Sequence, residues 1–216
     1  MDERKVLTTE QIHLLACPEI SYELCCRTLA RLTKQKRIKR ARFSLTQPYF
    51  YWSDKRPKAS RVEHTIGVNW IYTFLRLMKV KVQTFQTEPR DYEPIVEPDA
   101  FAILEYTLKK QYYFGEFHRD ESGNLFDKIP KYDALYKKLF DERKQGRKSY
   151  WWIDLYQEQS FGVIIVTTGK KENIEKHIRN EKAFGWKTEI FTLTELIEKC
   201  YRNAESIKKE RSVTNG

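Results

Sequence analysis

The feature that most constrains the fold is a continuous apolar run, FGVIIVTTG, at residues 161–169. A strand that is apolar at successive positions is covered on both faces, which is typical of parallel sheets. Three elements are expected after this run: a helix that stops at Gly185, the strand WKTEIFTL, and a last helix capped by Thr194. Strands that alternate with helices require crossover connections and parallel pairing. This part of the chain therefore predicts a sheet with helices on both sides.

The middle of the chain adds three strands to this sheet. A helix with a broad apolar face is expected from Ser60. Strand-like segments follow at 80–87, about 95–105 and 111–118, and their order fits an antiparallel meander. The next segment, KIPKYDALYKKLFDERK, has the spacing of an amphipathic helix that begins near Pro130. The sequence thus predicts an α/β (α+β) fold around a mixed sheet.

The N-terminal part shows a different pattern. Thr8 and Gln11 fit a capping box at the start of a helix over 7–16, and Ser21 fits the N-cap of a second helix that ends near Lys34. Two β-prone runs, 37–44 and 48–53, follow with a turn between them. Helix, turn, helix and hairpin is the order of a winged helix-turn-helix. The helix that normally precedes this pair is missing, so we expect the domain to be trimmed or to take a helix from elsewhere, such as a partner subunit.

Positive charge is concentrated in this N-terminal part. The whole chain has a formal net charge of +10, and residues 1–60 contain 13 Lys and Arg against 6 Asp and Glu. Six of the nine residues from 34 to 42 are basic. Such a cluster beside a helix and hairpin favours binding to the phosphates of DNA. The expected DNA-binding residues are Ser21, Tyr22, Arg27, Lys34, Lys36, Arg37, Lys39, Arg40, Arg42 and Gln47.

The stretch VEPDAFAILEYTLKKQYYFGEFHRD contains a nuclease-like pattern with one altered residue. Metal-dependent nucleases place an acid on one strand and Glu-x-Lys on the next, and their carboxylates hold Mg²⁺. Asp99 and Glu116 supply two such carboxylates, and Glu63 is a candidate third ligand. His118 stands where the lysine is expected.

Two interpretations of this pattern remain open. In an active site, the missing lysine would be replaced by His118, Lys128 or Lys131, and the catalytic set would be Asp99, Glu116, His118 and Lys131. In an inactive site, the two carboxylates would make structural hydrogen bonds and pair with Lys131, Arg119 or His64. The altered residue favours the inactive site.

Several segments in order resemble the replication-relaxation family of plasmids and other mobile elements. They are LARLTKQKRIKR before the hairpin, VEHTIGVNWIYTFLR, PDAF at 98–101, YYFGEFHRD at 112–120, KYDALYKKLF at 131–140 and FGVIIVTTGKKENIEKHI. The resemblance extends over nearly all of residues 7–197. It implies a winged helix followed by a degenerate restriction-endonuclease-like domain, and a role in replication, relaxation or transfer of DNA.

These observations lead to one main hypothesis and two alternatives. We expect a winged helix at 1–56, a restriction-endonuclease-like domain at 57–203 and a frayed tail at 204–216. The main hypothesis is a non-catalytic protein that binds double-stranded DNA, with a homodimer as a further expectation. The alternatives are a Mg²⁺-dependent nuclease or nickase that uses Asp99 and Glu116, and an adaptor for a relaxase or replication initiator. No cofactor is expected unless the site is active. No apolar run approaches the ~20 residues that span a bilayer, so a cytoplasmic protein is expected.

Overall fold

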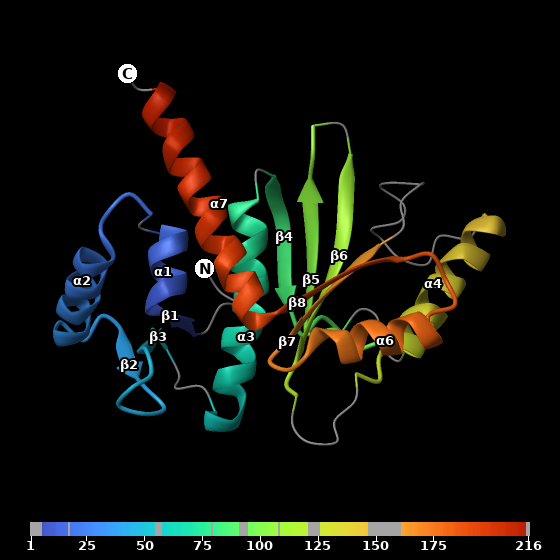
Figure 1. Ribbon diagram of the computed structural model, residues 1–216, viewed down its shortest axis with the longest axis horizontal. Helices are drawn as coiled ribbons and strands as arrows, with labels where there is room; N and C mark the ends of the chain where they lie inside the picture. The colour runs from blue at the N-terminus through green and yellow to red at the C-terminus, as the bar shows by residue number, and fades with distance from the viewer. Residues whose placement is uncertain are drawn as a thin grey trace. The chain divides into compact units, whose positions relative to one another are not determined.

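The computed structural model describes residues 6–16, 18–54, 58–78, 80–90, 95–107, 109–120, 126–146 and 161–214 (Figure 1). The chain divides into two compact units. One consists of Met1–Lys79 with Glu195–Gly216, and the other of Val80–Thr194. The first unit is therefore built from both ends of the chain. Among the described helices, none is both long enough and apolar enough to cross a membrane.

The first unit combines helices with a small antiparallel sheet. Its elements are β1 (Leu7–Thr8), α1 (Thr9–Ala16), α2 (Tyr22–Lys34), β2 (Lys39–Ala41), β3 (Phe50–Trp52), α3 (Ala59–Leu77) and most of α7 (Leu193–Thr214). The three strands lie in the order β1-β3-β2. The caps of α1 and α2 agree with the sequence, whereas α3 begins at Ala59 and α7 at Leu193, just ahead of the starts expected at Ser60 and Thr194. Thr8 and Gln11 exchange the two capping-box hydrogen bonds at 2.9 and 3.2 Å, and the Ser21 hydroxyl accepts from the Leu24 N–H at 3.2 Å.

Helix α3 is part of this first unit. Its residues Val62 and Ile66 pack against Phe50 and Trp52 of the sheet. Its Asn69 side chain donates a hydrogen bond to the carbonyl of Val6 at 2.6 Å. The chain itself thus supplies a further helix to this unit, from beyond the hairpin.

The expected domain limits differ from the observed units at both ends. The expected boundary near residue 56 falls before α3, whereas the first unit extends through Lys79 because α3 shares its core. The tail expected to fray from residue 204 is helical to Thr214. Leu196, Cys200 and Ala204 are all buried at four-residue spacing, so the apolar stripe of α7 reaches the residue at which fraying was expected to begin.

The second unit is built on a five-stranded mixed sheet in the order β4-β5-β6-β7-β8. The strands are Lys81–Thr87, Ala100–Glu105, Lys110–His118, Gly162–Thr167 and Lys187–Thr192. The first three are antiparallel, and β6, β7 and β8 are parallel. The meander and the parallel pairs that the sequence predicted are both confirmed.

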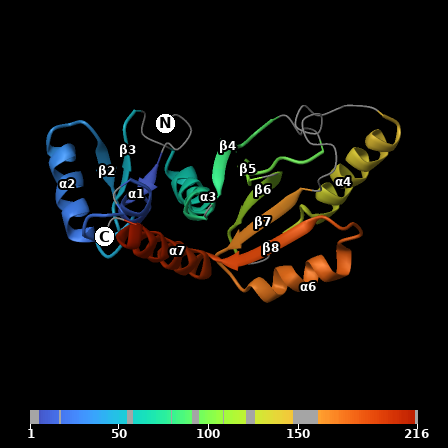
Figure 2. The same cartoon turned by 90° about the horizontal axis from the view of Figure 1, so that it is seen from above.

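The helices α4 (Ile129–Lys144) and α6 (Lys171–Glu181) cover one face of this sheet, and α6 lies alongside β8 (Figure 2). The core on this face joins strand residues such as Phe114 and Ile165 to Tyr132 of α4 and Ile174 of α6. The sequence led us to expect helices on both faces, and the two helices that the structure describes within this unit, α4 and α6, pack on the same one. Residues that face the other way, such as Leu104, are also buried.

Candidate functional site

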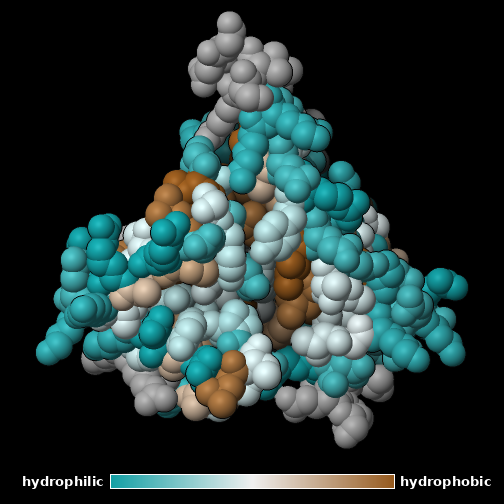
Figure 3. All heavy atoms as spheres, turned by 60° about the vertical axis from the view of Figure 1, so that its left-hand side comes forward, coloured by the Kyte–Doolittle hydropathy of each residue, from teal (hydrophilic) through white to brown (hydrophobic). Residues whose placement is uncertain are grey.

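A basic surface is formed where α2 ends and the β2–β3 hairpin begins. The six cations that the sequence singled out are all solvent-exposed: Lys34, Lys36, Arg37, Lys39, Arg40 and Arg42. The face of the molecule shown in Figure 3 is largely hydrophilic, with scattered groups of hydrophobic residues. On the hairpin itself, Phe43 and Leu45 are exposed, Leu45 by 80%.

The local backbone explains why these cations lie together. After α2, Lys36 adopts a left-handed conformation with φ of 58°. The N–H of Lys36 donates to the carbonyl of Thr33, and that of Arg37 to the carbonyl of Leu32, both at 3.0 Å. This pair of hydrogen bonds is the Schellman arrangement that ends many helices, usually with glycine at the left-handed position. The turn leads the chain directly from α2 into β2.

Two arginines are held on one side of the hairpin. The guanidinium groups of Arg40 and Arg42 lie 4.2 and 5.1 Å from the centre of the Tyr49 ring. Arg42 also donates to the carbonyl of Leu45 at 3.0 Å. Arg40 lies in β2 and Arg42 directly follows its last residue, Ala41, so the two arginines lie close together along the chain. The contact with Tyr49 orders the two cations and leaves them exposed.

The remaining expected DNA-binding residues are more widely spread. Ser21 and Tyr22 lie at the opposite end of α2 from Lys34, and the Ser21 hydroxyl is engaged in the cap. Arg27 forms an exposed i,i+4 ion pair with Glu23 at 3.9 Å. Gln47 is exposed between β2 and β3. The compact part of the surface is therefore the cationic run from 34 to 42.

A second candidate site lies at one edge of the five-stranded sheet. Strands β5 and β6 pair antiparallel with Ala100 opposite Gly115. This register places Asp99, just before β5, beside Glu116 in β6. The Phe117 N–H donates to Asp99 Oδ2 at 2.7 Å. The two acids that the sequence selected are thus neighbours.

Lys128 and Tyr132 complete this carboxylate site. Lys128 occupies the N-cap position of α4, and its Nζ lies 2.6 Å from Glu116 Oε2 and 3.5 Å from Asp99 Oδ1. The same ammonium donates to the carbonyl of Glu97 at 2.8 Å. Tyr132, one turn later, donates its hydroxyl hydrogen to Glu116 Oε1. Residues four apart share a helix face, so both side chains reach the carboxylates from α4.

Burial controls the acid–base behaviour of these groups. Glu116 is 1% exposed, and desolvation, with the charge of Asp99, raises the pKa of Glu116 to about 8, although Lys128 and Tyr132 act in the opposite direction. Burial lowers the pKa of Lys128, but the two carboxylates outweigh it and the net pKa is raised. Burial and the neighbouring Glu116 raise the pKa of Tyr132 well above its usual value. The site therefore favours a protonated lysine and tyrosine.

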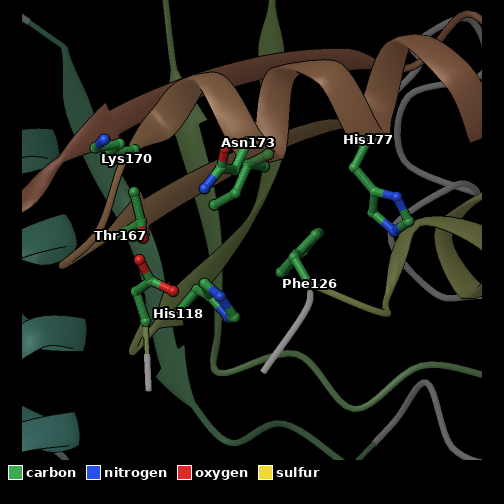
Figure 4. A pocket seen from close by; sticks show the side chains of 8 residues that line it. His118, Phe126, Thr167, Lys170, Asn173 and His177 are labelled. Atoms are coloured by element: carbon green, nitrogen blue, oxygen red, sulfur yellow. The ribbon is translucent and has the colours of Figure 1, made fainter. Parts of the chain in front are cut away.

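The contacts described for this cluster do not involve the other expected catalytic and metal-binding residues. Lys131 is exposed on α4, and Glu63 is exposed on α3 of the other unit. His118 packs edge-on against Phe126, with ring centres 5.9 Å apart. Figure 4 shows His118 in a pocket with Phe126, Thr167, Lys170, Asn173 and His177. The lysine that contacts both acids is Lys128, which the sequence offered as one of three replacements.

The residues of the carboxylate site do not fit a magnesium ion in this arrangement. Each of the four carboxylate oxygens of Asp99 and Glu116 already faces a donor from Lys128, Tyr132 or Phe117. Within the described ranges, no group of three or more His, Cys, Asp or Glu side chains is suited to holding a metal ion. Mg²⁺ requires oxygen ligands at about 2.0–2.1 Å on all sides, and here an ammonium lies against the carboxylates instead.

Comparisons with known proteins give limited information. No family model matches the sequence, and no curated protein matches it. Among solved structures, the chain is similar to the restriction endonuclease FokI, with 11% sequence identity and a TM-score of 0.44. The similarity covers 94% of this chain and 42% of the FokI chain.

Proposed function

We propose that this protein binds duplex DNA through a winged helix-turn-helix and does not cleave it. The setting implied by the sequence resemblance, replication or transfer of a plasmid or other mobile element, belongs to the same proposal. The observation that carries it is the exposed run of six cations at the junction of α2 and the hairpin. The nuclease-like second unit would then act as a scaffold or contact the DNA backbone.

The order of elements in the first unit supports this proposal. The unit contains a strand, two helices and a hairpin, in that order. The strand and the hairpin form a three-stranded antiparallel sheet, and α3 packs as a further helix against α1. In a winged helix-turn-helix, the second helix of the pair enters the major groove. In this chain that helix is α2. The hairpin would be the wing, and Arg40 and Arg42, ordered over Tyr49, would contact phosphates.

The affinity for duplex DNA measured against salt concentration tests this proposal. Each neutralised phosphate contributes roughly −0.9 to the slope of log affinity against log salt. Changing Lys36, Arg37, Lys39 and Arg40 together to alanine should reduce the magnitude of this slope by about 3 to 4 and weaken binding strongly at low salt.

The matched control removes four exposed cations from the second unit. Lys137, Lys176, Arg179 and Lys187 are all exposed there, and changing them to alanine lowers the net charge by the same amount. The control variant should keep most of the affinity and slope. Equal losses in both variants, or no binding of the wild type at low salt, would contradict the proposal.

A Mg²⁺-dependent nuclease remains the second candidate function. The observation in its favour is that Asp99 and Glu116 lie side by side with a lysine, Lys128, next to them. It requires nicking of supercoiled plasmid in the presence of Mg²⁺ or Mn²⁺, with loss of activity in Asp99→Ala and Glu116→Ala. Activity that survives both substitutions would exclude this site as its source.

A further inference from the structure

The ammonium group of Lys128 lies in a cage of three oxygens. Its Nζ is 2.6 Å from Glu116 Oε2, 2.8 Å from the carbonyl oxygen of Glu97 and 3.5 Å from Asp99 Oδ1. An ammonium has three N–H donors, and each has an acceptor here. Two carboxylates and a backbone carbonyl are also ligands of the type that a hard divalent cation takes. The lysine thus lies among the ligands that a metal ion would use.

The rest of the cluster closes this cage. Glu116 Oε1 accepts from Tyr132, and Asp99 Oδ2 accepts from the Phe117 N–H. The side chain of Glu116 is only 2% exposed, and those of Asp99 and Lys128 are 17% and 23% exposed. A divalent ion could enter only by displacing the ammonium, because two cations sharing these oxygens would repel each other in a poorly solvated site.

We propose that the Lys128 ammonium is a built-in substitute for a divalent metal ion at Asp99 and Glu116. The native chain then leaves Mg²⁺, Mn²⁺ and Ca²⁺ unbound at this position, and removal of the ammonium creates a site for them. The lysine also joins three segments, the chain before β5, strand β6 and the start of α4, as a structural metal would. This inference is independent of DNA binding by the first unit.

The charge balance predicts how the site responds when the lysine is removed. Without Lys128, Asp99 and Glu116 lie close together with no positive partner, and the folded protein is destabilised unless Glu116 is protonated or another cation takes the place of the ammonium. A divalent cation can restore the balance because alanine at 128 leaves space for the ion and its water ligands. The variant should therefore depend on metal for its stability, whereas the wild type should not.

The experiment compares wild type, Lys128→Ala and the double variant Lys128→Ala/Asp99→Asn, all as the full chain. Mn²⁺ binding is measured by electron paramagnetic resonance and titration calorimetry, and the melting temperature is measured with and without Mg²⁺, Mn²⁺ or Ca²⁺. We expect Lys128→Ala to melt at a lower temperature, to bind one Mn²⁺ and to recover part of its melting temperature when metal is added. The double variant should lose both responses.

Two results would overturn the inference. One is Mn²⁺ binding by the wild type that disappears in Asp99→Asn, because the lysine would then coexist with the metal. The other is a folded Lys128→Ala that gains no Mn²⁺ binding. If Lys128→Ala does not fold, Lys128→Gln provides the same test, since it removes the charge and keeps a hydrogen-bond donor.

Discussion

At the scale of single residues, Glu116 links the second unit's stability to pH. Its pKa is raised to about 8 by burial and by Asp99, so the folded state holds its proton more tightly than the unfolded chain does. The resulting stabilisation is complete below the ordinary glutamate pKa and is lost as the pH rises toward 8. Each unit of the shift corresponds to roughly 1.4 kcal/mol.

We therefore expect Glu116→Gln to flatten the pH dependence of stability. Glutamine keeps one acceptor oxygen for Tyr132 or Lys128 and does not titrate, so the fall in the free energy of unfolding between about pH 5 and 8 should diminish. Urea unfolding across this pH range measures the effect. Asp127→Asn is the matched control, because it removes an exposed carboxylate next to Lys128. Wild-type and Glu116→Gln curves with the same slope would contradict the expectation.

At the scale of elements, the C-terminal end of α2 combines two roles in one residue. Lys36 holds the left-handed conformation of the Schellman turn, which is unfavourable by roughly 1–2 kcal/mol for a residue with a Cβ atom. Its exposed cation also belongs to the basic surface. A residue chosen only for the turn would be glycine.

Lys36→Gly should therefore separate these two roles. We expect a gain of up to about 1 kcal/mol in the free energy of unfolding, together with weaker DNA binding and a salt slope smaller by about 0.9. Lys34→Gly removes the same charge within the helix, where glycine costs about 1 kcal/mol, and should lose both stability and affinity. Urea unfolding and DNA titration measure the two quantities. A Lys36→Gly variant that loses stability would contradict the argument.

Local patterns account for much of what the sequence predicted about these elements. The caps at Thr8 and Ser21 lie where expected, and so do strands β5 and β6 next to Asp99. These features depend on residues that are close in the sequence. The expected start of α4 near Pro130 is confirmed, because the helix begins at Ile129. The choice between Lys128 and Lys131 depends instead on the rotation of α4 about its axis, and Lys128, the N-cap, shares a face with Tyr132. This rotation is set by the packing of α4 on the sheet, which no local sequence pattern specifies.

At the scale of the whole molecule, the sequence did not reveal that α3 and α7 belong to the first unit. Their apolar faces show that each helix is buried, but periodicity does not identify the partner. Val62 and Ile66 of α3 pack on Phe50 and Trp52, and α7 returns from the far end of the chain. The sequence led us to expect a boundary near residue 56, yet the core of the first unit extends across it.

This division predicts how fragments of the chain behave. A fragment of residues 1–56, the domain expected from sequence, lacks the partners of Phe50, Trp52 and Val6 on α3. We expect it to show no cooperative unfolding transition and to lose most of its affinity for DNA, because a core this small does not offset the entropy of ordering the chain. Joining residues 1–79 to 195–216 through a flexible linker should restore both properties. Circular dichroism during heating and DNA titration test the pair, and a cooperative, fully DNA-binding 1–56 fragment would show that α3 and α7 are dispensable.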